Sequence, residues 1–283
     1  MPYARITALT SLAMMAFAGN SLLCRAALKH TSIDAGSFTT IRLISGALLL
    51  WLVARTRRGS HTGEGNWFSA LTLFSYAACF SFAYVSLPIA TGALLLFGAV
   101  QATMIGHGIR AGERLRRWQL AGLVLAFGGL VDLLLPGLST PPLSGSILML
   151  VAGASWGIYS LRGKGAGDTI NVTAGNFLRA VPIAVVMKLL MLNHTALDVR
   201  GVGYAIASGA LASGIGYAIW YAALPALKAT KAATVQLSVP AIAALGGIIF
   251  LGEPITFRLA WASVAILGGI ALVILGQRSA DGA

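Results

Sequence analysis

The sequence predicts an all-α membrane protein with ten transmembrane helices, arranged as two five-helix repeats of inverted topology. Three observations predict this class: charged side chains are few, ten apolar runs are long enough to cross a bilayer, and short motifs recur in the two halves of the chain. A membrane-crossing helix needs about 20 mostly apolar residues. The segments between the runs leave no room for a soluble domain.

Charged side chains are too few to cover a soluble surface. Only 20 Lys and Arg and 8 Asp and Glu occur among 283 residues, and 57% of the residues are hydrophobic. Soluble domains carry about 25% charged residues. The net charge of +12 comes from basic residues between the apolar runs, which form no continuous stripe for nucleic acid. The composition therefore excludes a soluble enzyme, a nucleic-acid-binding domain and a disordered chain.

The reactive side chains predict no catalytic or metal centre. Cys24 and Cys79 both lie inside apolar runs, which indicates neither a disulfide framework nor a zinc site. The four histidines are dispersed, and the chain has no glycine-rich nucleotide-binding loop. We therefore expect a protein that is not an enzyme and needs no cofactor or metal.

Polar residues divide the chain into ten apolar runs, which we interpret as membrane spans. Runs of this length predict helices, because the strands of a membrane barrel have about ten residues of alternating polarity. The second and seventh runs each contain an arginine. The predicted spans cover residues 6–28, 36–54, 67–86, 88–108, 117–135, 143–161, 172–192, 201–221, 226–250 and 259–277.

The lysines and arginines predict the orientation of these spans. With a cytoplasmic N-terminus, the cytoplasmic segments hold 13 of them and the outer segments hold three. This bias satisfies the positive-inside rule, so we expect both termini in the cytoplasm and the chain in the inner (plasma) membrane. The apolar run 6–23 is too long for the hydrophobic region of a typical signal peptide and meets no clean small-residue cleavage site, so we expect it to remain as the first span.

The two halves of the chain repeat the same short motifs. Gly112-Glu113 and Gly252-Glu253 are each followed, fifteen residues after the glutamate, by a Gly-Gly pair. Leu87-Pro88 recurs as Leu224-Pro225 at an offset of 137 residues. We therefore predict a duplication into residues 1–140 and 141–283, with five spans in each half. Because five is odd, the second half must enter the membrane upside down, a construction common in secondary transporters.

These features resemble the EamA-type branch of the drug/metabolite transporter superfamily. The similarity rests on the ten spans, the two Gly-Glu pairs, Trp156-Gly157, the related segment 17–20, and the arginines Arg42 and Arg179 of the second and seventh spans. It covers essentially the whole chain. Membership implies a small-molecule substrate, export of amino acids, other metabolites or toxic organic compounds, and a monomer in the lipid bilayer.

The resemblance also implies a central cavity between the first, third, fourth, sixth, eighth and ninth spans. On these spans Tyr76, Phe80 and Tyr84 recur every fourth residue and share one helix face, and Tyr217 and Tyr221 repeat that spacing. The alternative is a packing stripe, or a position at the membrane interface for Tyr84 and Tyr221. The candidate substrate-binding residues are Asn20, Tyr76, Phe80, Gln101, Trp156, Tyr159, Tyr217 and Gln236.

Gln101 and Gln236 place an amide in the middle of a span, one in each half. An amide at that depth must find a partner. Helix–helix hydrogen bonding and recognition of a substrate's amino or carboxylate group explain it equally well, and both alternatives stay open.

We expect four charged residues to have structural roles and one proline to bend a helix. We expect Arg42 and Arg179 to cap carbonyls of neighbouring helices, although carboxylate attraction or a gate is the functional alternative. Glu113 and Glu253 are expected to position helix ends near basic residues. Pro240 lies in the middle of the ninth predicted span and should kink it.

The function that these features favour is a secondary transporter that exports small organic metabolites by alternating access. Aromatic lining favours amino acids, and aromatic or apolar ones in particular, because stacking gives affinity without a fixed charge. The central spans contain no carboxylate, which favours facilitated exchange over strict proton antiport. The alternatives are an exporter of drugs or other toxic organic compounds, or a channel-like facilitator.

Overall fold

The protein is an all-helical bundle. The structure is a computed structural model, and it describes residues 3–56, 64–110, 112, 117–135, 140–163, 168–223, 227 and 235–278, among which no strand occurs. Its helices are α1 (Tyr3–His30), α2 (Ala35–Thr56), α3 (Trp67–Tyr84), α4 (Ile89–Arg110), α5 (Arg117–Leu134), α6 (Leu143–Gly163), α7 (Thr169–Leu190), η1 (Leu192–His194), α8 (Val199–Ala207), η2 (Ser208–Ile215), α9 (Gly216–Ala223), α11 (Ser238–Leu251) and α12 (Phe257–Arg278).

Within these ranges the apolar helices fall on the predicted runs. Eight are long and apolar enough to cross a membrane, and the continuous helix α8–η2–α9 counts as one of them. Two shorter apolar helices, at residues 238–251 and 257–273, fall on the ninth and tenth predicted runs. The prediction of an all-α, multi-pass membrane protein is confirmed, and the arrangement as ten inverted spans stays a prediction.

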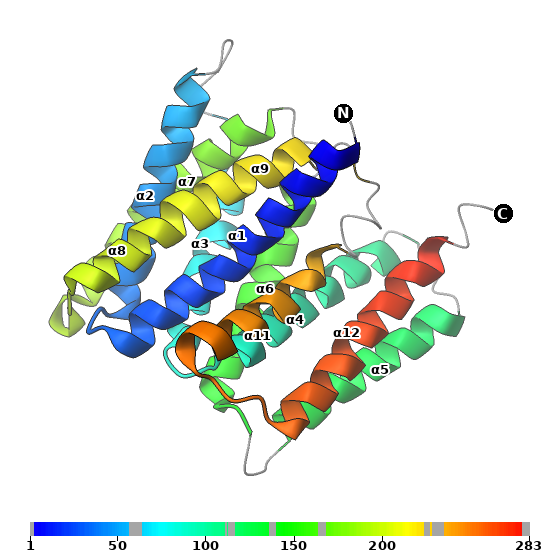
Figure 1. The fold of residues 1–283 in the computed structure, drawn as a ribbon. Coiled ribbons are helices and arrows are strands. Elements are labelled where there is room, and N and C mark those ends of the chain that lie inside the picture. Colours follow the sequence, from blue (N-terminus) through cyan, green and yellow to red (C-terminus); the bar gives the residue numbers. More distant parts are fainter. Residues whose placement is uncertain are drawn as a thin grey trace.

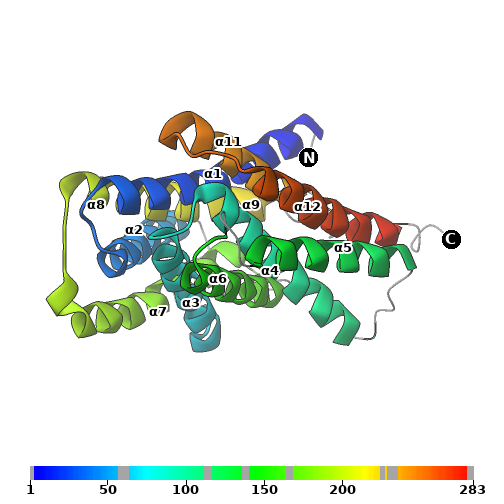
Figure 2. The same cartoon turned by 90° about the horizontal axis from the view of Figure 1, so that it is seen from below.

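Helices from the two halves of the chain pack against each other throughout the bundle. Helix α1 lies between the continuous helix α8–η2–α9 and α11, while α2 packs on α7 (Figure 1). Helix α6 contacts both α3 and α4. The pair α5–α12 forms one end of the bundle, opposite α2, α7 and α8 (Figure 2). Neither half therefore forms a separate body.

A close approach of two glycines joins α5 to α12. A Cβ atom added to Gly122 would lie 2.5 Å from the carbonyl oxygen of Gly269. Small residues at such a crossing let two helix backbones touch, which is how helices associate where water does not drive packing. Gly128, on the same helix, has nothing within 4 Å of the position of its Cβ, so only some of the glycines of α5 are required for packing.

Glu253 connects the end of α11 to the start of α4 and to α1. Gly252 ends α11 in a left-handed conformation (φ 61°), and the adjacent Glu253 is 7% exposed. One of its oxygens accepts from the guanidinium of Arg25 on α1 at 3.0 Å, and the other accepts from the backbone N–H of Ile89 at the start of α4 at 2.7 Å. Glu253 therefore positions helix ends, as predicted; Glu113, its counterpart in the first half, lies outside the described residues.

A second ion pair lies beyond the end of α1, where the chain turns into α2. Asp34 accepts from the backbone N–H of Ser37 at 2.8 Å and so satisfies the first turn of α2. The ammonium of Lys188, on α7, lies 3.0 and 3.1 Å from the two carboxylate oxygens. The backbone N–H of Ala196 also donates to Asp34, at 3.0 Å. This one carboxylate therefore ties α2, α7 and the segment before α8 together.

Two spans differ from the regular helices that the sequence predicts. Residues 208–215 of the eighth span form a π-helix, η2, which the apolar pattern does not reveal. In the ninth span, the helical residues 235–236 are separated from α11 by a turn at Leu237. Pro240 lies in the first turn of α11 and has no N–H to donate to the carbonyl of Gln236, four residues earlier. The helix is therefore interrupted close to the position at which the sequence predicts a kink.

Candidate substrate-binding site

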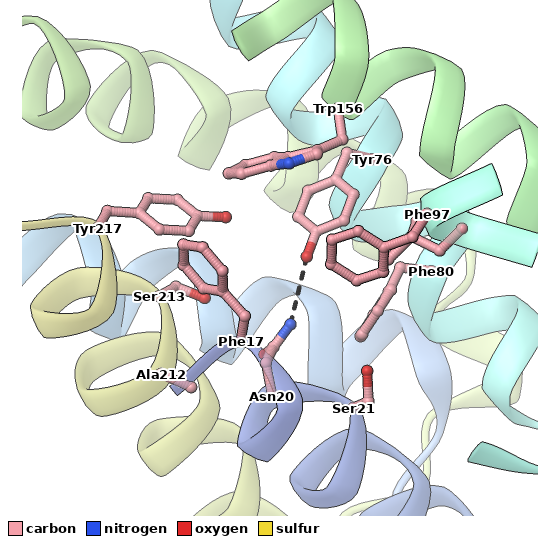
Figure 3. Close-up of a pocket in the computed structure, with 11 residues that line it drawn as sticks. Phe17, Asn20, Ser21, Tyr76, Phe80, Phe97, Trp156, Ala212, Ser213 and Tyr217 are labelled. Atoms are coloured by element: carbon pink, nitrogen blue, oxygen red, sulfur yellow. Dashed lines mark hydrogen bonds between the residues drawn. The ribbon is translucent and has the colours of Figure 1, made fainter. Parts of the chain in front are cut away.

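A small cavity lies where six helical segments meet. Its wall comes from α1, α3, α4, α6, η2 and α9, and therefore from both halves of the chain (Figure 3). Its volume is about 20 Å³, which is room for roughly one water molecule. The lining residues are Phe17, Asn20, Ser21, Tyr76, Phe80, Leu96, Phe97, Trp156, Ala212, Ser213 and Tyr217.

Trp156 is the centre of an aromatic cluster. Its ring centroid lies 4.9 Å from that of Tyr76 and 5.0 Å from that of Tyr217. Tyr159 follows at 5.7 Å and Phe17 at 6.3 Å, the latter edge-on. In Figure 3 the indole projects from α6 above the rings of Tyr76, Phe17 and Tyr217. A planar apolar group that entered the cavity would meet ring faces on several sides, and such stacking is worth about 0.5–1.5 kcal/mol for each pair.

Polar side chains beside the cavity form one connected network of hydrogen bonds. Ser208 donates to the side-chain oxygen of Asn20 at 2.6 Å, and the amide nitrogen of Asn20 donates to the hydroxyl oxygen of Tyr76 at 3.3 Å. The guanidinium of Arg42 donates to the same hydroxyl oxygen at 3.2 Å and, through Nε, to Ser213 at 3.4 Å. Asn20 and Tyr76 therefore join α1 and α3 to a buried cation on α2.

The two intramembrane arginines have different surroundings. Arg179 donates to the backbone carbonyls of Glu64 at 2.9 Å and of Gly175 at 3.0 Å, so it caps carbonyls as predicted. Arg42 does not: its hydrogen bonds go to the hydroxyls of Tyr76 and Ser213. The physical reason is local packing, because Gly209 brings η2 against the backbone of Arg42 and places Ser213 beside the guanidinium.

The structure places the eight predicted site residues in three groups. Asn20, Tyr76, Phe80, Trp156 and Tyr217 all line the central cavity. Two others lie outside its wall: Gln101 is 3% exposed, with no hydrogen-bond partner for Nε2 among the described residues, and Gln236 lies just before α11 and is partly buried. Tyr159 contacts the ring of Trp156 and lines a second pocket.

Several lining residues were not among the predicted site residues. Phe17 and Ser21 lie on the first span beside Asn20, and the spacing of three residues from Phe17 to Asn20 could have indicated a shared face. Leu96, Phe97 and Ala212 resemble ordinary apolar packing residues. Ser213 reaches the wall from the π-helix η2, whose register the sequence pattern does not indicate.

The second pocket is larger and lies at the far end of α3. Its volume is about 200 Å³. Its wall combines the start of α3, the end of α6 and the start of α7 with Tyr221 of α9. Tyr159 separates it from Trp156 and the central cavity. The lining residues are Gly65, Asn66, Ser69, Tyr159, Arg162, Gly163, Thr169, Val172, Thr173, Asn176 and Tyr221.

Known proteins resemble this chain in sequence and in fold. The model of the EamA-like transporter family matches residues 143–275. An uncharacterised protein of Pseudomonas aeruginosa is 56% identical over 100% of both chains. The threonine/homoserine exporter RhtA of Salmonella typhimurium is 30% identical over 79% of this chain and 76% of its own length. One solved crystal structure, 18% identical in sequence, has a TM-score of 0.68 over 96% of this chain and 99% of its own.

The eight long apolar helices define the class of integral, multi-pass membrane proteins. The similarities define the class more narrowly, because the chain belongs to the EamA-like transporter family. The resemblance that the sequence motifs indicated is therefore confirmed.

Proposed function

We propose that the protein is a secondary transporter that exports small organic metabolites, with amino acids as its favoured substrates, by alternating access. The observation that carries the proposal is the central cavity, whose wall combines aromatic rings with hydrogen-bonding groups and comes from both halves of the chain. Sites between two repeats, near the middle of the membrane, are typical of secondary transporters.

The packing pattern supports two inverted halves, residues 1–140 and 141–283. Exchanging the halves maps α1 onto α6, α2 onto α7, α3 onto α8–α9, α4 onto α11 and α5 onto α12. Under this exchange the contact α4–α6 becomes α11–α1, α3–α6 becomes α9–α1, and α3–α7 becomes α8–α2; all of these contacts occur. The pairs α2–α7 and α5–α12 map onto themselves. This pattern is expected of a duplicated five-helix unit.

The two ends of the bundle differ in a way that fits one state of a transport cycle. Arg25 bonds Glu253 and the carbonyls of Tyr84 and Val85 at the end of α3. The larger pocket opens at the opposite end of α3, which the positive-inside rule assigns to the cytoplasm. We interpret the molecule as closed on the outer side, with the larger pocket as the cytoplasmic entrance. The central cavity must widen before it holds a substrate.

The chemistry of the cavity wall favours amino acids over cationic drugs. None of the residues that line the cavity is Asp or Glu, and a carboxylate is the usual partner of a cationic ligand. The relative RhtA is named as a threonine/homoserine exporter, and the aromatic cluster favours a larger apolar or aromatic side chain in this chain. A channel-like facilitator is the second candidate; a cavity with room for about one water molecule speaks against an open pore.

Counterflow in vesicles of purified, reconstituted protein tests the proposal. Vesicles preloaded with L-threonine or L-phenylalanine should take up the labelled amino acid faster than empty vesicles, and uptake should saturate. Only a carrier that alternates between two sides gives this trans-stimulation. Uptake that rises linearly with concentration, with no effect of preloading, would indicate a channel. The absence of uptake for amino acids and for a panel of organic cations would reject the transporter proposal.

A further inference from the structure

We infer that Arg42 supplies the positive charge that binds the carboxylate of the substrate, with the hydroxyls of Tyr76 and Ser213 as the donors between this cation and the cavity. The inference rests on the proposed function and names the substrate class: a small monocarboxylate, amino acids included. The corresponding amides, esters and amines bind more weakly, because they lack the anionic group.

The first step of the argument is the isolation of the charge. Arg42 is 2% exposed, and a cation at that depth is costly unless it pairs with an anion. Among the described residues no carboxylate pairs with it: Glu253 pairs with Arg25, and Asp34 pairs with Lys188. Its Nη1 has no hydrogen-bond partner within the described part of the chain. Such an uncompensated cation fits a site whose anion arrives from solution.

The second step is the position of the cation behind the cavity wall. The guanidinium carbon lies 5.2 Å from the ring centroid of Tyr76 and 5.1 Å from that of Phe80. Both rings line the cavity, as does Ser213, which accepts from Arg42 Nε. Two rings and one hydroxyl therefore hold the guanidinium plane in place, and the charge lies one side chain away from the cavity.

The third step is the state of the two hydroxyls. The oxygen of Tyr76 accepts from both Arg42 and Asn20, so its own proton is available to donate. The oxygen of Ser213 likewise accepts from Arg42, and its proton is available in the same way. A cation that donates to a hydroxyl oxygen strengthens that hydroxyl as a donor. The hydroxyls of Tyr76 and Ser213, together with the unpartnered Nη1 of Arg42, are donors that can bind the two oxygens of a carboxylate.

The remaining wall fits the rest of such a ligand. Phe17, Trp156 and Tyr217 present ring faces, which accept an apolar side chain by stacking and an ammonium group by cation–π attraction. An α-amino acid can therefore place its carboxylate near Tyr76 and Ser213 and its ammonium group over a ring. The discrimination is electrostatic, because only the anionic group neutralises Arg42.

Arg179 provides the matched control. It occupies the position equivalent to Arg42 in the second half, 137 residues later. Its guanidinium donates to the carbonyls of Glu64 and Gly175, which do not line the central cavity. A Lys at this position removes the guanidinium nitrogen that donates to both carbonyls but leaves the cavity wall unchanged.

Transport by reconstituted vesicles tests the inference with labelled L-phenylalanine and L-threonine as probes. In the wild type, phenylalaninamide and phenethylamine should compete at least about tenfold more weakly than phenylalanine, the loss typical of a missing charged hydrogen bond. Tyr76→Phe and Arg42→Lys should each raise the half-saturation concentration by roughly tenfold for the same amount of folded protein. Arg179→Lys should lower the amount of folded protein and leave the half-saturation concentration unchanged.

A transport-independent measurement completes the test. Arg42→Met removes the cation and keeps an apolar side chain of similar length, so the apparent Tm without substrate should equal or exceed that of the wild type. A clear loss of folded protein in this variant means that Arg42 is structural and overturns the inference. Equal competition by the amide, or unchanged half-saturation in Tyr76→Phe and Arg42→Lys, overturns it too. Wild-type uptake of amines or amides without carboxylates leaves the transporter proposal standing and rejects the inference alone.

Discussion

Gln101 is a buried amide whose hydrogen-bond partner bears on substrate binding. Its amide nitrogen has no partner among the described residues, and an unpaired buried donor costs about 1–3 kcal/mol. Gln101 follows Phe97, a lining residue, by one helical turn on α4. Within the described part of the chain, the helix–helix hydrogen bond that was one of the two predicted explanations is therefore not found for this nitrogen. A substrate or a water molecule is a partner that can be tested.

The substitution Gln101→Leu tests whether the partner of this amide is a substrate or a water molecule. We expect an apparent Tm equal to or above that of the wild type, because the substitution removes an unpaired amide and keeps its approximate size. If a substrate uses the amide, the half-saturation concentration in the counterflow assay should rise several-fold at equal folded protein. A lower Tm with unchanged half-saturation would show that Gln101 stabilises the bundle instead.

Among the predicted site residues, those that line the cavity include side-chain types that are unusual for a membrane span. Tyr76 and Tyr217 are aromatic hydroxyls on apolar helices, and both line the cavity. The role of Arg42 could not be predicted, because its environment depends on Gly209 and Ser213 of η2, which are distant in sequence. The same π-helix moves residues out of the regular helical register. Gln236 is a candidate because the sequence predicts that it lies in the middle of a span. In the structure it lies just before the start of α11 and is not among the residues that line the cavity.

At the scale of helices, close contact between α5 and α12 depends on Gly122. A Cβ there would lie 2.5 Å from the carbonyl oxygen of Gly269 and 2.9 Å from the Cβ of Leu272, so the helices must separate. We expect Gly122→Ala to destabilise the protein by about 1–3 kcal/mol, the usual effect of overpacking, as a lower apparent Tm.

Gly128→Ala, on the same helix, is the control for this prediction. Nothing lies within 4 Å of its added Cβ, so the apparent Tm should stay the same or rise slightly, because alanine has the higher helix propensity. Equal Tm changes for the two variants would contradict the close contact of α5 with α12.

The loop between α1 and α2 carries a pH-dependent contribution to stability. Burial alone would raise the pKa of Asp34, but hydrogen bonds from Ser37, Ala196 and Lys188 outweigh it and lower the pKa from 3.8 to about 2. A lowered pKa in the folded state means that the stabilisation is present above the unfolded value of 3.8 and is lost as the pH falls towards 2.

Thermal unfolding of the wild type and of Asp34→Asn as a function of pH tests this contribution. At pH 5 and above we expect the wild type to be the more stable, because the ionised carboxylate pairs with Lys188. The difference should shrink steadily below about pH 4, as the wild-type carboxyl group becomes protonated. A difference that stays constant down to the acid limit would indicate that the charge of Asp34 contributes nothing.

At the scale of the whole molecule, the orientation in the membrane is open to a direct test. The start of α1 and the end of α12 lie towards the same face of the bundle (Figure 1), which agrees with the excess of basic residues in the predicted cytoplasmic segments. Ser60 and Ser139 lie outside the described residues, in segments assigned to opposite sides. A cysteine at position 60 should react with an impermeant reagent only from inside, and one at 139 only from outside; the reverse pattern would contradict the topology.

The central claim is that the aromatic cavity between the two halves is where substrate binds, and Trp156 is the residue on which it depends most. Trp156 is 9% exposed and contacts the rings of Tyr76 and Tyr217, whereas Trp261 on α12 is 56% exposed on the outside of the bundle. The measurement is amino-acid counterflow for Trp156→Ala and Trp261→Ala, each normalised to folded protein in the vesicles. We predict a several-fold loss of normalised transport for Trp156→Ala, because each ring contact is worth about 0.5–1.5 kcal/mol, and no loss for Trp261→Ala. Normal transport by the folded Trp156→Ala protein would contradict the claim and place the substrate elsewhere.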